Sequence, residues 1–336
     1  MKERRIGVIG VGGRTGTMFA FELKRTADVL GIGRDIEDIQ RKKLFIERKG
    51  AQPKLFEEKV ITDSQFLNSE FLPEILFLTT RNPVGRIVKY YYQKIKEYSL
   101  STNESYFPTL ILSQNGIVTG EDAICALKEI LGPDYKKIRV VRLVLFNPID
   151  KRKVGDSVYI TYSLPIRIGF GKISGPGDLR DIALIFKKAN FEAKQFLSEE
   201  IKNLEFSKLF LNLIGMASAT QGFSIKQGFQ KSEIFKEEMK ALKEYIRIVK
   251  ASGGKFLNLF NHPVRLLAFF FNILPTDFFL PFKNYFAKLM SKGRKGKVKD
   301  LSEIEYYNGA VVNLGKKVGI PAPVNQRILK RASRKS

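Results

Sequence analysis

The stretch Arg5-Ile-Gly-Val-Ile-Gly10-Val-Gly-Gly-Arg-Thr-Gly16 decides the fold of this 336-residue chain. Its apolar first half predicts a short buried strand, and the glycines that follow predict a tight turn. A helical pattern over residues 17–25 and a second strand over residues 28–33 complete a strand, turn, helix and strand unit. In such a unit a dinucleotide pyrophosphate lies on glycine backbone at a helix N-terminus. The residues expected to contact this cofactor are Gly10, Gly12, Gly13, Arg14 and Thr15.

The glycine spacing fits a dinucleotide fingerprint incompletely. Gly10 and Gly12 stand at the first two glycine positions, but Thr15 occupies the third and Gly16 follows one residue late. The strand, turn and helix context favours dinucleotide binding, with a purely structural turn as the alternative.

The residue that closes the second strand selects between the two nicotinamide cofactors. An acidic residue there binds the ribose hydroxyl of NAD, whereas an arginine accommodates the additional phosphate of NADP. Arg34 comes directly after the strand and Asp35 follows it. This order predicts NADP(H).

Strand and helix patterns alternate up to about residue 197 and give way to helices after it. In the first part, further strands are predicted at residues 74–80, 109–116, 137–146, 157–163, 165–171 and 191–197, and helices at residues 36–47, 87–92 and 176–189. In the second part, helices are predicted at residues 198–215, 232–249, 256–271 and 302–318. We therefore expect an α/β fold, with a Rossmann-type NADP-binding domain over residues 1–197. An all-helical domain for substrate binding and dimerisation is expected over residues 198–336.

Two polar residues follow predicted strands, at the edge where parallel sheets bind ligands. Arg81 comes after the strand at residues 74–80 and could contact a cofactor phosphate or begin the next helix. Asn115 lies in the turn after the strand that begins at residue 109, and we expect it both to contact the cofactor and to take part in catalysis. An Asn-Gly turn needs no functional reason by itself.

The composition limits the chemistry. A single histidine (His262) and a single cysteine (Cys125) leave no cluster for zinc and no Ser-His or Cys-His system, so no metal site is expected. Cys125 falls in a helical run, where a small buried filler is the expected role. Acid–base groups are therefore expected among Lys, Glu and Asp.

The formal net charge is +24, and basic residues concentrate at residues 41–43, 292–299 and 327–335. Such a field attracts polyanions, but no aromatic residues are interleaved with the basic runs in the manner of a nucleic-acid motif. We expect solvated faces, a basic loop and a frayed tail, and no nucleic-acid partner. The charge also concentrates small anionic substrates and cofactors.

The first residues lead directly into a strand without the apolar run of a signal peptide. The most apolar region, residues 264–282, has an uninterrupted apolar run of only six residues, 266–271, which is too short to span a membrane. A core helix or a subunit contact is expected there, with interfacial membrane binding as the alternative. These features predict a cytoplasmic protein without a membrane partner, and the apolar helical half predicts a homodimer.

Residues 205–215, Glu-Phe-Ser-Lys-Leu-Phe-Leu-Asn-Leu-Ile-Gly, form a helical pattern that is apolar nearly all round. Lys208 and Asn212 are four residues apart and therefore project from one face. Desolvation lowers the pKa of an ammonium group, which suits a residue that gives up a proton during turnover. The alternative is a lysine whose charged end reaches water from near the helix start. The helical half begins just before Lys208, and junctions between domains often hold small-molecule sites.

The run from Asp300 to Asn325 is the most distinctive in the chain: Asp-Leu-Ser-Glu-Ile-Glu-Tyr-Tyr-Asn-Gly-Ala-Val-Val-Asn-Leu-Gly-Lys-Lys-Val-Gly-Ile-Pro-Ala-Pro-Val-Asn. Ser302 and Glu305 have the spacing of a capping box. Glu303 is then the first helical residue, where its charge could simply complement the helix dipole.

This run resembles the C-terminal signature of the 2-dehydropantoate 2-reductase (ketopantoate reductase) family, in which Thr-Glu-Ile-Asp-Tyr-x-Asn-Gly precedes a helix and a Pro-x-Asn. Residues 113–117, Ser-Gln-Asn-Gly-Ile, are similar to that family's Gln-Asn-Gly turn. Residues 208–212 are similar to its Lys-x-x-x-Asn helix. The glycine turn at Gly10 and the arginine at Arg34 stand where the family binds NADPH.

The resemblance implies NADPH-dependent reduction of ketopantoate to pantoate, a step of pantothenate and coenzyme A biosynthesis. It assigns Lys208 as the general acid that protonates the developing alkoxide, and Glu303 as the residue that holds the substrate hydroxyl and helps to place Lys208. Asn115 and Asn212 orient the substrate or the lysine, and Ser291 stands at a substrate-contacting serine. A preorganised cation is the group that physical chemistry also favours beside a developing oxyanion.

Three departures leave the substrate open. Met216 replaces a second asparagine, the sequence after Ser291 differs from that of the family, and residues 255–288 have no counterpart. A reductase of another 2-keto acid is therefore kept as a second hypothesis. Two further hypotheses are a dehydrogenase of the same architecture that acts on a 3-hydroxy acid or a polyol, and a non-catalytic anion- or nucleic-acid-binding protein on a Rossmann scaffold.

Overall fold

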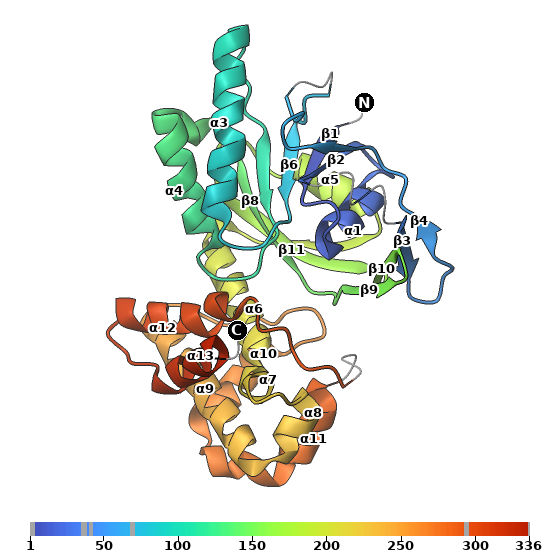
Figure 1. Cartoon of the computed structure of the whole chain (residues 1–336). Helices are drawn as coiled ribbons and strands as arrows, with labels where there is room; N and C mark the ends of the chain where they lie inside the picture. The colour runs from blue at the N-terminus through green and yellow to red at the C-terminus, as the bar shows by residue number, and fades with distance from the viewer. Residues whose placement is uncertain (1–3, 35–38, 40–42, 68–70, 292–295, 335–336) are drawn as a thin grey trace. The chain divides into compact units, whose positions relative to one another are not determined.

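The computed structural model describes residues 4–34, 39, 43–67, 71–291 and 296–334 (Figure 1). By its internal contacts the chain divides into two compact units. Unit 1 comprises Met1–Gln114 and Thr119–Ile201, and unit 2 comprises Asn115–Val118 and Lys202–Ser336. The short segment that begins with Asn115 therefore groups with the C-terminal part of the chain.

Unit 1 is built on an eight-stranded sheet with the strand order β12-β11-β8-β7-β6-β1-β2-β5. Its strands are β1 (Arg5–Ile9), β2 (Asp28–Gly33), β5 (Val60–Thr62), β6 (Ile75–Leu78), β7 (Thr109–Leu112), β8 (Val140–Leu145), β11 (Ile166–Ser174) and β12 (Phe191–Gln195). Neighbouring strands are parallel except for the β8–β11 pair. The strand order reverses beside β1, and in open α/β sheets ligands bind outside the carboxyl ends of strands at such a switch point.

Helices cover both faces of this sheet. They are α1 (Arg14–Leu23), α3 (Val84–Thr102), α4 (Thr119–Leu131) and α5 (Arg180–Lys188), and a 3₁₀ segment, η1 (Gly132–Lys137), follows α4. In β6, Phe77 packs into the core shared with α1 and α5, whereas Leu76 packs into the core shared with α3 and α4. Because both faces are buried, the central parallel strands are largely apolar runs, and this made them recognisable in the sequence. The edge strand β12 is mostly exposed.

A four-stranded sheet of order β4-β3-β10-β9 adjoins this core in unit 1. Its strands are β3 (Lys43–Arg48), β4 (Lys54–Leu55), β9 (Asp150–Val154) and β10 (Ser157–Tyr162). The helix predicted over residues 36–47 is wrong from residue 43 onward, and residues 36–38 and 40–42 lie outside the described part. Leu44 and Ile46 alternate into the core, and Arg48 binds the buried Glu22 through two hydrogen bonds of 2.8 Å. These tertiary partners favour a strand over a helix.

Unit 2 is helical, and its described residues contain no strand. The helices are α6 (Ile201–Leu213), α7 (Met216–Thr220), α8 (Ile225–Gln230), α9 (Ser232–Ala251), α10 (Val264–Ile273), α11 (Lys283–Met290), α12 (Asn308–Lys317) and α13 (Pro323–Ser333), with 3₁₀ segments η3 (Thr276–Phe282) and η4 (Ile304–Tyr306). A further 3₁₀ segment, η2 (Ser198–Glu200), precedes α6 at the end of unit 1. The predicted fold class, an α/β part followed by a helical part, is confirmed.

Four local predictions are wrong. The helix predicted over residues 256–271 begins only at Val264, and the basic run at residues 327–335, expected as a frayed tail, is helical up to Ser333. Ser302 and Glu305 form no capping box, because α12 begins only at Asn308 and the Ser302 N–H donates to the Asp300 carboxylate at 2.9 Å. Glu303 instead precedes the single 3₁₀ turn η4. Cys125 is exposed rather than buried, because the core-facing side of α4 is made by other residues such as Ala126.

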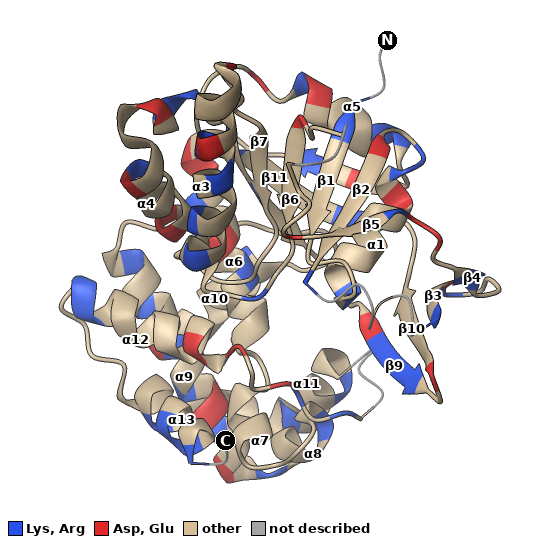
Figure 2. Ribbon diagram, turned by 45° about the horizontal axis from the view of Figure 1, so that its top comes forward, with Lys and Arg blue, Asp and Glu red and all other residues tan. Residues whose placement is uncertain are grey.

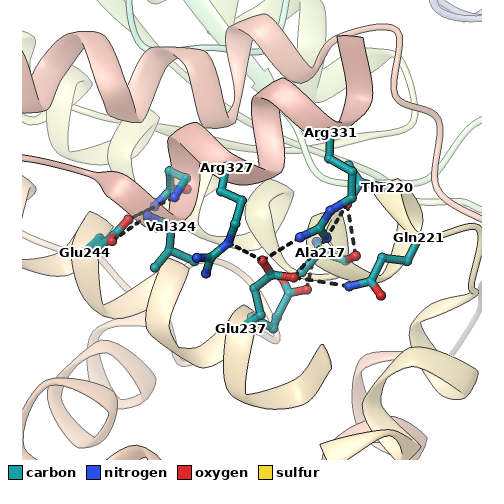
Figure 3. A network of polar contacts seen from close by, with 10 residues as sticks. Ala217, Thr220, Gln221, Glu237, Glu244, Val324, Arg327 and Arg331 are labelled. Atoms are coloured by element: carbon teal, nitrogen blue, oxygen red, sulfur yellow. Dashed lines mark hydrogen bonds and ion pairs between the residues drawn. The ribbon is translucent and has the colours of Figure 1, made fainter. Parts of the chain in front are cut away.

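Helix α9 organises unit 2 through acidic side chains that hold neighbouring helices. Glu237 accepts hydrogen bonds from Arg327 at 3.0 Å and from Arg331 at 2.8 Å, which ties α9 to α13 (Figure 3). Glu244 accepts the N–H groups of Val324 and Asn325 at the start of α13, at 2.8 and 3.0 Å. A carboxylate at a helix N-terminus satisfies open N–H groups and complements the dipole.

Two asparagines of the C-terminal run have a structural role. The Asn308 amide donates to Asn325 Oδ1 at 2.9 Å, and the Asn325 amide donates to the Ala241 carbonyl at 2.9 Å. Both asparagines are buried. They therefore join α12, α13 and α9 and contribute to the packing of unit 2.

Glu238 caps α7 in the same way as Glu244 caps α13, by accepting the N–H groups of Gly215 at 2.7 Å and Ala217 at 3.1 Å. Its side chain is only 1% exposed. Burial raises the pKa of Glu238 to about 7, and the backbone donors and the charge of Lys299 offset only part of that rise.

We expect Glu238 to make stability fall with rising pH. Between its ordinary pKa of 4.5 and about 7, the folded protein binds more protons than the unfolded chain, so the free energy of unfolding decreases as the pH rises through this window. The effect amounts to about 3 kcal/mol for the full window. In Glu238→Gln, denaturant unfolding at pH 5 and pH 8 should show a smaller difference than in the unmodified protein, whereas Glu233→Gln on the same helix should match the unmodified protein. An unchanged difference in Glu238→Gln would contradict the assignment.

Candidate functional site

Three of the predicted catalytic and substrate-binding residues are joined by hydrogen bonds in unit 2. The Asn115 amide donates to Glu303 Oε2 at 3.1 Å, and the Asn212 amide donates to Asn115 Oδ1 at 3.3 Å. All three side chains are half-buried. Residues 97 and 188 positions apart in the chain are thus brought into one polar cluster.

Tyr307 completes this cluster and was not anticipated from the sequence. Its hydroxyl donates to Glu303 Oε2 at 2.7 Å, so this carboxylate oxygen accepts from both Tyr307 and Asn115. Hydrogen bonds to a carboxylate are stronger than those between neutral groups. The two donors therefore fix the orientation of Glu303. Tyr307 lies four residues after Glu303, a spacing that could have indicated the contact, but the helix then expected at residue 303 begins only at residue 308.

Lys208 lies one helical turn before Asn212 on α6, so the two side chains project from the same side of the helix. Lys208 is half-buried, while its neighbours Leu209 and Phe210 are in the core. The apolar helix predicted around Lys208 is confirmed.

Lys299 is a second cation of this region. It departs from the solvated basic loop predicted for residues 292–299, whereas residues 296–298 are exposed as that prediction expects. Its ammonium group donates to the carbonyls of Asn212 and Ile214, the latter at 3.1 Å, and lies 5.7 Å from the centre of the Tyr307 ring. It therefore holds the end of α6 close to the residue that orients Glu303. Residues 292–295 of that run lie outside the described part.

Two residues named from the family resemblance take no part in the cluster's hydrogen bonds. Ser291 ends α11, and its hydroxyl donates to the Lys288 carbonyl at 3.4 Å. Met216 is fully buried and begins α7, after Gly215 has interrupted the helix with a φ of 91°. Because Met216 belongs to a different helix from Asn212, its departure from the family pattern removes no polar group from the exposed side of α6.

The glycine turn of unit 1 requires glycine at three positions. Gly10 and Gly12 have φ values of 97° and 92°, which favour glycine. At Gly16, a Cβ atom would lie 2.4 Å from the Gly10 carbonyl oxygen, so Gly16 permits the close packing of α1 on the turn. In the dinucleotide fingerprint the third glycine permits this close packing of helix on turn. Here Gly16, rather than Thr15, has that role.

The start of α1 is suited to an anion. Gly13 is the N-cap and provides no side-chain hydrogen bond, and the first turn contains no acidic residue. The first N–H groups of a helix have no acceptor within the helix and carry partial positive charge. Thr15 is half-buried beside them and Arg14 is exposed.

Lys151 adds a positive charge to this turn, although no local feature of the sequence indicates it. Its ammonium group donates to the Gly12 carbonyl at 2.8 Å from β9, a strand with several basic residues (Figure 2). The two residues are 139 positions apart, and the β9 strand itself had not been predicted. The glycine motif by itself therefore could not point to Lys151.

The other predicted cofactor residues of unit 1 are accessible. Arg34 directly follows β2 and Arg81 follows β6 within the loop before α3, and both are exposed. Asp35, the residue that argues for NAD, lies outside the described part. Asn115, predicted to serve both cofactor and catalysis, belongs to the hydrogen-bonded cluster of unit 2.

Arg142 supports the chain just before Asn115. This buried side chain on β8 donates to the carbonyls of Leu112 at 3.0 Å and Gln114 at 2.5 Å. The Gln114 amide in turn donates to the Leu78 carbonyl at 2.9 Å. The end of β7 is therefore held by a buried cation and fixed to the end of β6.

Within the described residues, no three His, Cys, Asp or Glu side chains are grouped as a metal site would require. The cluster offers a carboxylate, two amides and a phenol, with Lys208 one turn away on α6 and the Lys299 ammonium group beside the Tyr307 ring. Such a set can hold a polar substrate through hydrogen bonds and deliver a proton to an oxygen that becomes negative.

A search by sequence against curated proteins finds no significant match. Residues 200–336 match the family model described as ketopantoate reductase PanE/ApbA C terminal. Across the described part of the chain, no helix is both long and apolar enough to cross a membrane.

Solved structures of similar fold cover nearly the whole chain. A PanE/ApbA family ketopantoate reductase from Ralstonia eutropha JMP134 superposes with a TM-score of 0.68 at 14% identity, covering 99% of this chain and 100% of that chain. D-mandelate dehydrogenase with NADH and anilino(oxo)acetate gives a TM-score of 0.69 at 12% identity, covering 98% of each chain. A ketopantoate reductase from Staphylococcus aureus, described as dimeric, gives 0.60 at 16% identity, covering 99% of this chain and 100% of that chain. Likenesses at these identities show the fold.

Proposed function

We propose that this protein catalyses the NADPH-dependent reduction of 2-dehydropantoate to pantoate. Its residues 200–336 match the family model of ketopantoate reductases, and its fold is that of the family throughout. The observation that carries the proposal is the chain of hydrogen bonds from Asn212 through Asn115 to Glu303. Lys208 lies one turn before Asn212 on α6. The product would serve pantothenate and coenzyme A biosynthesis in the cytoplasm.

The glycine turn of unit 1 fits a nicotinamide dinucleotide. The pyrophosphate would be held by the backbone at Gly10, Gly12 and Gly13 and by the start of α1, with the charges of Arg14 and Lys151 beside it. Thr15 and Arg81 are further candidates for phosphate contact. The bound cofactor supplies the hydride for C2 of the keto acid.

The residues of unit 2 would bind and protonate the substrate. Lys208 would donate a proton to the keto oxygen as that oxygen gains negative charge, which yields the alcohol. Glu303, held by Tyr307 and Asn115, would accept a hydrogen bond from the substrate hydroxyl. Asn212 would orient the substrate or Lys208, and Ser291 stays a candidate for substrate contact.

A second candidate is the reduction of another 2-keto acid. The similarity in fold to D-mandelate dehydrogenase supports it, because this architecture accommodates more than one substrate. The altered sequence after Ser291 also supports a different substrate. A homodimer is part of both proposals, supported by the S. aureus protein that is described as dimeric.

The decisive experiment is an NADPH oxidation assay with ketopantoate beside phenylglyoxylate and other 2-keto acids. The first proposal expects ketopantoate to have the highest kcat/KM, and the second expects another acid to exceed it. Absence of turnover with every keto acid, together with salt-sensitive nucleic-acid binding, would favour the non-catalytic binding protein that the +24 charge suggests. Light scattering of the same sample tests the dimer.

Arg34 is expected to select NADPH over NADH. Its guanidinium lies directly after β2, where it can pair with the phosphate that distinguishes NADP. In Arg34→Asp, the ratio of kcat/KM for NADPH to that for NADH should fall by about tenfold or more. Arg25→Asp, at a charged position just before β2, provides the matched control. An unchanged ratio in Arg34→Asp would remove Arg34 from cofactor selection.

A further inference from the structure

Residues 266–289 of unit 2 expose two rows of large apolar side chains. Eight of the sixteen exposed large hydrophobic residues in the described part of the chain fall in this segment. They are Leu266, Phe269, Phe270 and Ile273 in α10, Phe278 and Phe282 in η3, and Tyr285 and Leu289 in α11. The exposed fraction reaches 65% at Tyr285.

The first row follows one side of α10, because its members are three and four residues apart. The second row continues over η3 and α11. The opposite side of the same elements already fills the core of unit 2. The Phe271 ring lies 5.2 Å from that of Phe279 and 5.9 Å from that of Phe286. These elements are therefore apolar on their inner and outer sides. A patch of exposed apolar residues this large usually marks an interaction site.

Basic side chains contact or flank the elements that carry these rows. Lys243 donates to the Leu274 carbonyl between α10 and η3, Lys236 pairs with Asp277 at 3.1 Å, and Lys283 donates to Ser232 at 2.8 Å. Arg265 and Lys288 are exposed beside the apolar rows. Asp277 is the one acidic residue between residues 255 and 290. We call the eight apolar residues, together with the exposed Arg265 and Lys288, the aromatic–basic surface.

We propose that the aromatic–basic surface binds the surface of a membrane that contains anionic phospholipids. Phenylalanine and leucine on one side of a short helix can enter the boundary between headgroups and acyl chains. Lysine and arginine at the edge extend toward lipid phosphates, where each contributes electrostatic attraction. With ten residues in α10 and eight in α11, these helices are too short to cross the bilayer and would lie on it.

Charge favours lipid over a second copy of the chain as the partner of this surface. Pairing two such surfaces would place the exposed cations of one surface against those of the other. Like charges placed against each other oppose association. Anionic headgroups reverse the sign of this interaction, and the net charge of the whole chain then attracts the protein to the bilayer.

The test is co-sedimentation of the full-length protein with vesicles of phosphatidylcholine alone or of equal parts phosphatidylcholine and phosphatidylglycerol. We expect at least about tenfold tighter binding to the anionic vesicles at about 0.1 M salt, and weaker binding as salt is added. Failure to bind either kind of vesicle overturns the proposal. Binding that neither depends on phosphatidylglycerol nor responds to salt also overturns it.

Paired variants locate the binding. Phe269→Ser/Phe282→Ser should weaken binding to anionic vesicles by at least about tenfold, because it removes two exposed rings. Leu100→Ser, at a 75% exposed leucine of α3, is the matched control and should bind as the unmodified protein does. Arg265→Glu/Lys288→Glu should abolish the preference for phosphatidylglycerol. Circular dichroism and thermal melting check that each variant is folded.

Two results would contradict the assignment of membrane binding to the aromatic–basic surface. Unchanged vesicle binding by the folded double-serine variant would place the membrane contact elsewhere. A change from dimer to monomer in that variant, with vesicle binding unchanged, would identify the surface as a subunit interface. None of these measurements depends on reductase activity, so the outcome is independent of the proposed function.

Discussion

Lys208→Ala should lower kcat for the preferred 2-keto acid by about two to four orders of magnitude. The proposed role of Lys208 is to give a proton to the keto oxygen as negative charge develops there, and alanine leaves that oxygen without a cation or a proton donor. The loss should appear in kcat rather than in KM, because the contact strengthens in the transition state. Steady-state kinetics with saturating NADPH measures both.

Controls separate this role from a structural one. Lys202→Ala removes an exposed lysine from the same helix and should leave kcat within a few-fold of the unmodified protein. NADPH titration by fluorescence should give the same Kd for Lys208→Ala as for the unmodified protein, since the glycine turn that is proposed to hold the cofactor lies in unit 1. Near-normal turnover by folded Lys208→Ala would rule out Lys208 as the general acid.

The fold could be predicted wherever one segment carried its own signal. The strands β1, β2, β6 and β7 are continuous apolar runs, and β2 has the bounds that the sequence predicted, residues 28–33. Strand β3 could not be predicted in the same way. Its partners are β10 and the buried Glu22 on α1, which are distant in sequence and decide its conformation.

In the polar cluster, too, some residues could be predicted from sequence motifs and others could not. The resemblance to ketopantoate reductases, now confirmed by the family match to residues 200–336, pointed to Asn115, Asn212 and Glu303. The structure joins these three side chains by hydrogen bonds. Lys299 and Tyr307 were missed because their partners depend on how α6 ends and on where α12 begins. Neither feature follows from the local pattern, since Gly215 interrupts a helix that the apolar residues would have continued.

Glu303→Gln should lower kcat/KM by about two to three orders of magnitude. Glutamine has nearly the same shape but carries no charge, and one of its two terminal atoms can no longer accept a hydrogen bond. The hydrogen bonds from Asn115 at 3.1 Å and Tyr307 at 2.7 Å would lose their charged acceptor. We expect both the positioning of Asn115 and the contact to the substrate hydroxyl to weaken, so KM should rise as kcat falls.

The matched control is Glu305→Gln, which removes an exposed carboxylate two residues further along the chain and should keep its activity. Equal activity of Glu303→Gln and Glu305→Gln would exclude Glu303 from the reaction. The double variant Lys208→Ala/Glu303→Gln then tests whether the two residues act together. If Glu303 helps to place Lys208 for proton transfer, the double variant should be little slower than Lys208→Ala alone, because the second change disturbs a step that the first has already removed. Fully additive losses would mean that Glu303 contributes only through its own contact with the substrate.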